Sequence, residues 1–76
     1  MTQAWFEVRN NDGKVMMVGV QTPITVDGDE FAFRFEEAIV EELGRVMSVK
    51  FICIAERLSY GHSAMDSAIR MIGDVL

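Results

Sequence analysis

The chain has 76 residues, half of them hydrophobic, and a formal net charge of −5 at pH 7. This length allows one domain at most, residues 1–76, and predicts marginal stability for an isolated monomer. The single cysteine excludes an intramolecular disulfide. Without a secretory signal or an apolar run of about 20 residues, a cytoplasmic protein with no membrane contact is expected.

The negative charge is concentrated in one segment. Seven acidic residues and one basic residue lie between residues 27 and 42, whereas the rest of the chain carries five acids and six bases. A surface of this sign argues against direct contact with nucleic acid or with an anionic membrane, because both attract positive charge. It favours contact with a basic surface on another protein.

Two strands are predicted before the acidic segment. In residues 3–9, Phe6 and Val8 alternate with charged residues, which indicates one buried face and one solvated face. Residues 15–20 are apolar on both faces and are interpreted as an interior strand. The turn residues at 10–13 end in Asp-Gly, so a hairpin is expected between the two strands.

Residues 27–47 are predicted to form one long acidic helix. Asp27 is placed as its N-cap, with Glu30 at the spacing of a capping box. The residues that recur at helical spacing predict a core face: Phe31, Phe35, Ala38, Ile39, Leu43 and Val46. The alternating phenylalanines leave a second interpretation open, in which residues 24–35 form a hairpin and the helix begins after it.

A second apolar line is predicted on the opposite face of this helix. At about 100° per residue, Phe33, Val40 and Met47 align at seven-residue intervals among acidic residues. The candidate partner-binding residues are Phe33, Glu36, Glu37, Val40, Glu41 and Met47. A helix packed on two sides, or a chance alignment, would explain the same line. Glu41 is also spaced for an ion pair with Arg45.

A third strand and a second helix are predicted after the acidic helix. Residues 49–55 are apolar on both faces and are interpreted as another interior strand, with Cys53 buried in the core. Ser63 and Asp66 have capping-box spacing. The following stripe predicts a surface helix: Met65, Ala68, Ile69, Ile72 and Leu76. The order β-β-α-β-α predicts an α+β domain, a three-stranded sheet backed by two helices with its other face uncovered.

The sequence carries no motif for catalysis, a cofactor or a metal ion. His62, the only histidine, is interpreted as a local contact of Asp66 rather than a catalytic base. The acids at residues 27–30 begin like a calcium loop, but Phe31 and Ala32 occupy the positions of a ligand and of the required glycine. Nucleotide-binding and zinc-binding spacings are absent from the sequence. A non-enzymatic protein without a cofactor is therefore expected.

Three functions are ranked on these grounds. The first is a protein-binding module that docks its acidic helix on a basic partner surface, as an inhibitor does. Small acidic anti-CRISPR and anti-restriction proteins of phages and mobile elements are similar in size and charge, and this similarity transfers no site residues. The second is a homodimeric structural or accessory protein that self-associates through an apolar helix or sheet face. The third is a small enzyme with a site between subunits, built on His62 or a glutamate.

Overall fold

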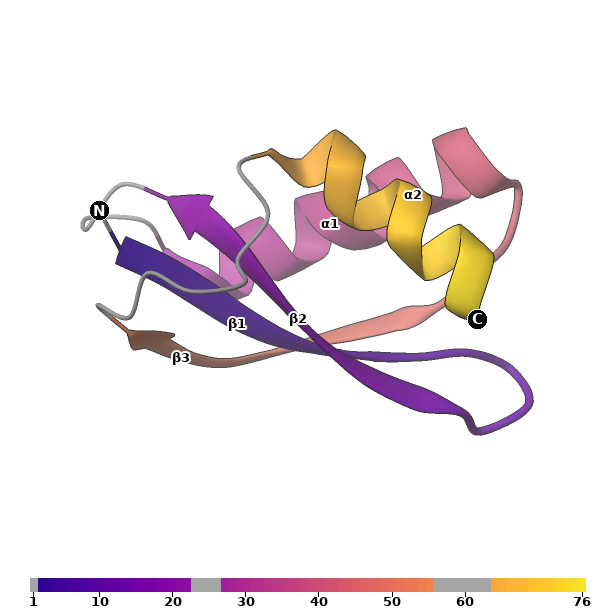
Figure 1. Ribbon diagram of the computed structural model, residues 1–76, viewed down its shortest axis with the longest axis horizontal. Helices are drawn as coiled ribbons and strands as arrows, with labels where there is room; N and C mark the ends of the chain where they lie inside the picture. Colours follow the sequence, from indigo (N-terminus) through magenta and orange to yellow (C-terminus); the bar gives the residue numbers. More distant parts are fainter. Residues whose placement is uncertain (1, 23–26, 56–63) are drawn as a thin grey trace.

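The computed structural model describes residues 2–22, 27–55 and 64–76. Its elements are β1 (Thr2–Arg9), β2 (Val15–Thr22), α1 (Gly28–Leu43), β3 (Ser48–Ala55) and α2 (Met65–Val75). The three strands form one antiparallel sheet, and both helices lie over the same face of it (Figure 1). The predicted α+β class and the β-β-α-β-α order are confirmed.

The first strand lies in the middle of the sheet, whose order is β2-β1-β3. Phe6 of β1 stands opposite Val18 of β2 and opposite Phe51 of β3. The prediction that residues 15–20 and 49–55 are interior strands is therefore wrong, because both belong to edge strands. The polarity of the side chains depends on the surroundings of the two faces of a strand. The number of neighbouring strands depends on backbone hydrogen bonding, which side-chain polarity does not determine.

A β-bulge interrupts β3 where it passes the centre of β1. Cys53 pairs with Trp5 and Phe51 pairs with Phe6, so Ile52 is an extra residue without a directly opposed partner. Trp5 points to the sheet face away from the helices, because it alternates with the buried Ala4 and Phe6. Cys53 stands beside it and is exposed. The prediction of a buried Cys53 is therefore wrong, since both α1 and α2 lie over the opposite face.

The start and the end of α1 each have a local cause. The Asp27 carboxylate accepts hydrogen bonds from the backbone amides of Asp29 (3.1 Å) and Glu30 (3.2 Å), so the predicted N-cap is confirmed. Gly44 adopts a left-handed conformation (φ 66°), and its N–H bonds to the Val40 carbonyl at 2.9 Å. The predicted helix to residue 47 is therefore too long. Residues 28–35 are helical, which excludes the hairpin interpretation for that segment.

Phe6 is the centre of the hydrophobic core. Its ring centroid lies 5.4 Å from that of Phe31, 5.5 Å from that of Phe35 and 5.8 Å from that of Phe51. Around these rings pack the buried residues of the predicted helix stripes, which confirms most of both stripes: Phe35, Ile39, Ala68, Ile69 and Ile72. Val46 is 66% exposed, so its predicted place in the core is wrong.

Arg45 links the end of α1 to the end of α2. Its guanidinium donates to the carbonyl of Leu76 at 2.9 Å and to that of Gly73 at 3.4 Å, and both carbonyls lie at the end of α2. The predicted ion pair with Glu41 does not form, because Arg45 follows the glycine that ends α1. The predicted cap by Ser63 and the predicted contact of His62 lie outside the described residues.

The first residue of α1 provides a test of this packing. A Cβ atom on Gly28 would lie 2.5 Å from atoms of the Phe51 ring. We expect Gly28→Ala to lower the free energy of unfolding by about 1–3 kcal/mol, because overpacking outweighs the gain in helix propensity. The measurement is equilibrium denaturation of both proteins.

Gly73→Ala in α2 is the matched control. A Cβ atom there would lie 2.9 Å from Cδ2 of Leu43, the end of a flexible side chain, whereas the Phe51 ring is rigid. This variant should be neutral or more stable by up to about 1 kcal/mol. Equal stabilisation by both substitutions would contradict the contact between Gly28 and Phe51.

Candidate functional site

The outward side of α1 carries most of the predicted partner-binding residues. Phe33 is 63% exposed and Val40 is 43% exposed, as their spacing on the helix predicts. Glu37 and Glu41 are exposed beside them. The structure therefore brings four of the six residues to one solvent-facing surface, and we call Phe33, Glu37, Val40 and Glu41 the acidic helix surface. Their role in binding stays a prediction.

Met47 does not belong to this surface. It is 3% exposed and packs in the core, beyond the residue at which α1 ends. Its predicted alignment with Phe33 and Val40 is wrong, because Gly44 stops the helix and the chain turns back towards the sheet. Residues that are seven apart share one face only within a continuous helix, and Met47 lies beyond the end of α1.

Glu36 is half-buried and contacts the sheet instead of facing outward. Its carboxylate accepts a hydrogen bond from the backbone N–H of Val49 on β3, at 2.9 Å. This contact joins the helix to the edge of the sheet and removes Glu36 from the acidic helix surface. No spacing in the sequence points to it, since its two residues lie on separate elements.

The acidic helix surface keeps its negative sign in the folded protein. Arg34, the only base between residues 27 and 42, donates to the Glu30 carboxylate at 2.8 Å, as an exposed i,i+4 pair. This pair balances one acid with one base, while Asp29, Glu37 and Glu41 remain exposed along the same helix. A basic surface of a partner is the chemistry that such a surface attracts.

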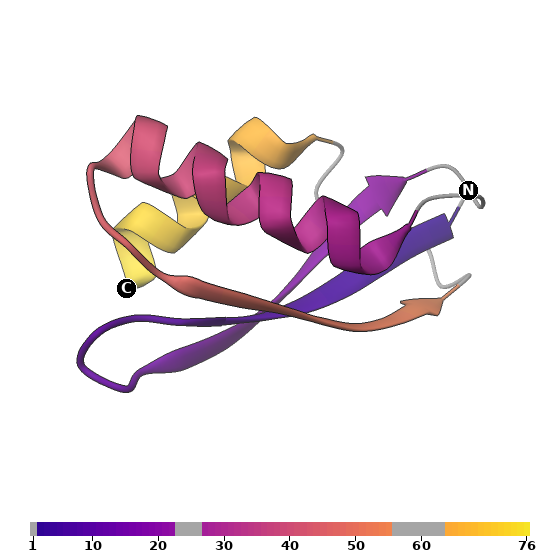
Figure 2. The same cartoon turned by 180° about the vertical axis from the view of Figure 1, so that it is seen from behind.

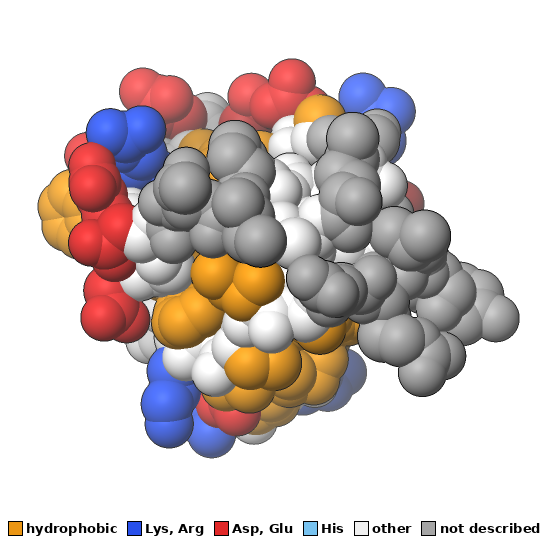
Figure 3. Space-filling model, turned by 90° about the vertical axis from the view of Figure 1, so that its left-hand side faces the viewer, with side chains coloured by type: hydrophobic (Ala, Val, Ile, Leu, Met, Phe, Trp, Pro, Cys, Tyr) orange, Lys and Arg blue, Asp and Glu red, His pale blue; other side chains and the backbone are white. Residues whose placement is uncertain are grey.

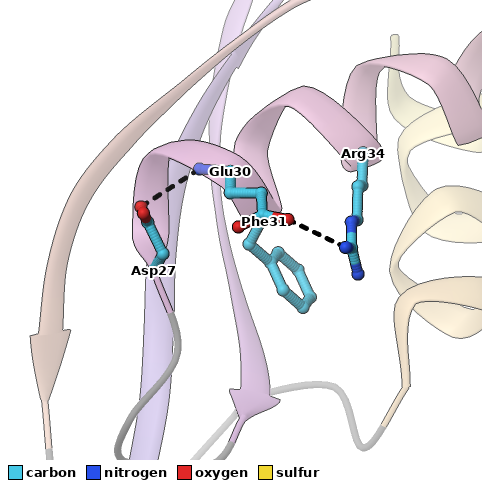
Figure 4. Close-up of a pocket in the computed structure, with 4 residues that line it drawn as sticks. All are labelled: Asp27, Glu30, Phe31 and Arg34. Atoms are coloured by element: carbon cyan, nitrogen blue, oxygen red, sulfur yellow. Dashed lines mark hydrogen bonds and ion pairs between the residues drawn. The ribbon is translucent and has the colours of Figure 1, made fainter.

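A small cavity of about 140 Å³ opens at the start of α1. It is lined by Asp27, Glu30, Phe31 and Arg34 (Figure 4). Asp27 accepts from backbone amides of the first helical turn, and Glu30 pairs with Arg34. These polar groups hold the helix end together, so the cavity does not present a nucleophile with a base or a set of metal ligands.

A second cavity, of about 240 Å³, lies between the β1–β2 turn and the end of α2. It is lined by Asn10, Asn11, Asp12, Arg45, Val46, Met47 and Leu76. The Leu76 carbonyl accepts from Arg45 at 2.9 Å and from the Asn10 side-chain amide at 3.4 Å. The Arg45 and Asn10 side chains here connect the end of α1 and the β1–β2 turn to the end of α2.

The sheet face away from the helices is the other apolar surface. Val15, Met17 and Ile52 are 43%, 48% and 42% exposed. Trp5 lies half-buried among them, with its indole against Gly19. Seen from one end, hydrophobic side chains gather towards the sheet side of the molecule and acidic side chains follow the helix side (Figure 3). Among the described residues, the exposed apolar face expected from the sequence is therefore present.

Comparison with known proteins adds no function. The chain matches no protein-family model, and comparison with curated proteins and with solved structures gives no match. Across residues 2–22, 27–55 and 64–76, the His, Cys, Asp and Glu residues form no group of three or more that could hold a metal ion. No helix in these segments is long and apolar enough to cross a membrane. The function is therefore argued from the exposed surfaces.

Two phenylalanines of α1 test the assignment of its faces. Phe35→Ala should lower the free energy of unfolding by about 3–5 kcal/mol, because the Phe35 ring is fully buried against Phe6. Phe33→Ala should change it by no more than about 0.5 kcal/mol, since most of that ring already contacts water. Denaturant titration of both variants checks this, and a large loss with Phe33→Ala would place Phe33 in the core.

Proposed function

We propose that this protein is a non-enzymatic binding module that docks the acidic helix surface on a basic, partly apolar surface of another protein. The observation that carries the proposal is the exposure of Phe33 and Val40 on a helix side that is otherwise acidic. Apolar anchors surrounded by charge have the composition of a protein interface, with an apolar centre and a polar rim.

The two kinds of side chain have different roles in this proposal. Burial of an apolar side chain of this size contributes about 1.5–3 kcal/mol, so Phe33 is the main anchor. Glu37 and Glu41 attract the basic partner, speed association and exclude partners of the wrong charge. A basic groove that binds nucleic acid fits this description. By occupying such a groove the module would act as a competitive inhibitor.

A homodimer formed through the open sheet face is the second candidate function. It is supported by the exposed Val15, Met17 and Ile52, which neither α1 nor α2 covers. Dimerisation through this face would bury apolar side chains, so the association of the two copies should be insensitive to salt or strengthened by salt. Binding of the acidic helix surface to a basic partner should weaken as salt rises. Salt dependence therefore separates the two candidates.

Charge reversal on α1 tests the proposed function. The double variant Glu37→Lys, Glu41→Lys should keep the fold, because both residues are exposed, and should lose its basic partners. The measurement is capture of proteins on immobilised wild type and variant, quantified by mass spectrometry at low and high salt. We expect wild type to retain basic proteins at low salt and to release them at high salt.

The double variant Asp66→Lys, Asp74→Lys is the matched control. Both aspartates are exposed on α2, and this variant changes the net charge by the same amount as the first. It should bind the same proteins as wild type. If both variants lose those proteins equally, overall charge explains the binding and the acidic helix surface does not.

A further inference from the structure

The outer edge of β3 has its hydrogen-bonding groups directed away from the sheet. Alternate residues of an antiparallel strand turn their N–H and C=O groups to opposite sides. Val49 turns its N–H outward, since it donates to Glu36, and Phe51 two residues later faces the same way. Figure 2 shows β3 in front, at the near edge of the sheet, with α1 above it.

We propose that this edge is a strand-pairing surface for a second copy of the chain, and that Glu36 and Lys50 prevent the pairing in the wild-type protein. An antiparallel strand pair has two-fold symmetry, so one edge pairs with its own copy. Pairing of Val49 with Phe51 of the copy places the two-fold axis at Lys50.

Glu36 blocks this pairing through the backbone. In the paired edge each copy would donate from Val49 and from Phe51. Glu36 already holds the Val49 N–H at 2.9 Å, so half of the required donors are occupied. The carboxylate also stands where the incoming strand would place its carbonyl oxygen.

Lys50 blocks the same pairing through charge. At the two-fold axis the exposed Lys50 would stand directly opposite Lys50 of the copy, and like charges in that position are destabilising. Lysine on an edge strand and a β-bulge are both features that limit edge-to-edge association. The bulge at Ile52 interrupts the regular edge directly after Phe51.

The surface beside this edge suits a second copy. Ile52 and Ile54 are exposed on β3, and Phe33 and Val40 are exposed on the helix above it. A standard interface buries roughly 800 Å² of each partner, so a dimer through this edge would bury these four side chains as well as the strand.

Pairing would bring the α1 helices of the two copies together. Glu37 and Glu41 of one copy would then approach those of the other, so added salt should strengthen the association by screening this repulsion. Binding of a basic partner has the opposite salt dependence. A failure of this proposal is therefore distinguishable from a failure of the proposed function.

The experiment is sedimentation equilibrium of the double variant Glu36→Ala, Lys50→Ala in low and high salt. We expect the weight-average mass to rise from the wild-type value towards twice that value, with a larger rise in high salt. The matched control is Asp74→Ala, Lys14→Ala, which removes one acid and one base from exposed positions on α2 and on the β1–β2 turn, away from this edge. Its mass should equal that of wild type, and an equal rise in the control would overturn the proposal.

A third substitution locates the contact. Ile54→Lys added to the Glu36→Ala, Lys50→Ala variant should restore the wild-type mass, because it places a charge on the apolar surface beside the pairing edge. Val15→Lys on β2 should leave the dimer intact. Reversal by Val15→Lys, or an unchanged mass in the Glu36→Ala, Lys50→Ala variant, would overturn the proposal.

Glu36→Asp, with a shorter side chain, is the variant to use if Glu36→Ala prevents folding. Glu36→Asp keeps the charge but is one methylene shorter, which removes its reach to the Val49 amide. The double variant Glu36→Asp, Lys50→Ala should show the same rise in mass while it unfolds cooperatively on heating. A cooperatively folded variant that keeps the wild-type mass would also overturn the proposal.

Discussion

The packing of Phe6 is the interaction on which the rest of the structure depends. Its ring contacts the rings of Phe31 and Phe35 on α1 and of Phe51 on β3, and its backbone pairs with Val18 of β2. One residue of the middle strand thus joins the helix layer to both edges of the sheet. Aromatic rings contribute large buried areas, which matters in a chain this short.

The two exposed surfaces follow from this arrangement. Because the aromatic core lies on one side of β1, both helices cover that side (Figure 1), and Trp5 and Met17 turn to the other side because they alternate with the buried Phe6 and Val18. The same packing commits one face of α1 to the core and turns its acids outward. Glu36 lies at the boundary between these regions, where its carboxylate joins the helix to the edge of β3. The candidate partner surface and the candidate strand-pairing edge are therefore neighbours on one flank of the molecule.

Predictions from the sequence were most accurate where the cause was local. The N-cap at Asp27, the apolar stripe of α2 and the exposure of Phe33 depend on spacing within one helix, and the structure bears them out. They failed where a distant residue decided the outcome. Cys53 is exposed because α1 and α2 both lie on the opposite side of the sheet, and Arg45 binds the end of α2 instead of a helical neighbour.

Hydrophobic periodicity and capping were enough to establish the α+β class, the order of the elements and the acidic, partly apolar side of α1. Each of these features depends on residues within a few helical turns or within one hairpin. The strand order, the burial of Met47 and the bond from Val49 to Glu36 depended on the assembled fold. They arise when β3 crosses to the free edge of β1 and the chain turns back after Gly44. Contacts between elements distant in sequence leave no periodic pattern in the residues that make them.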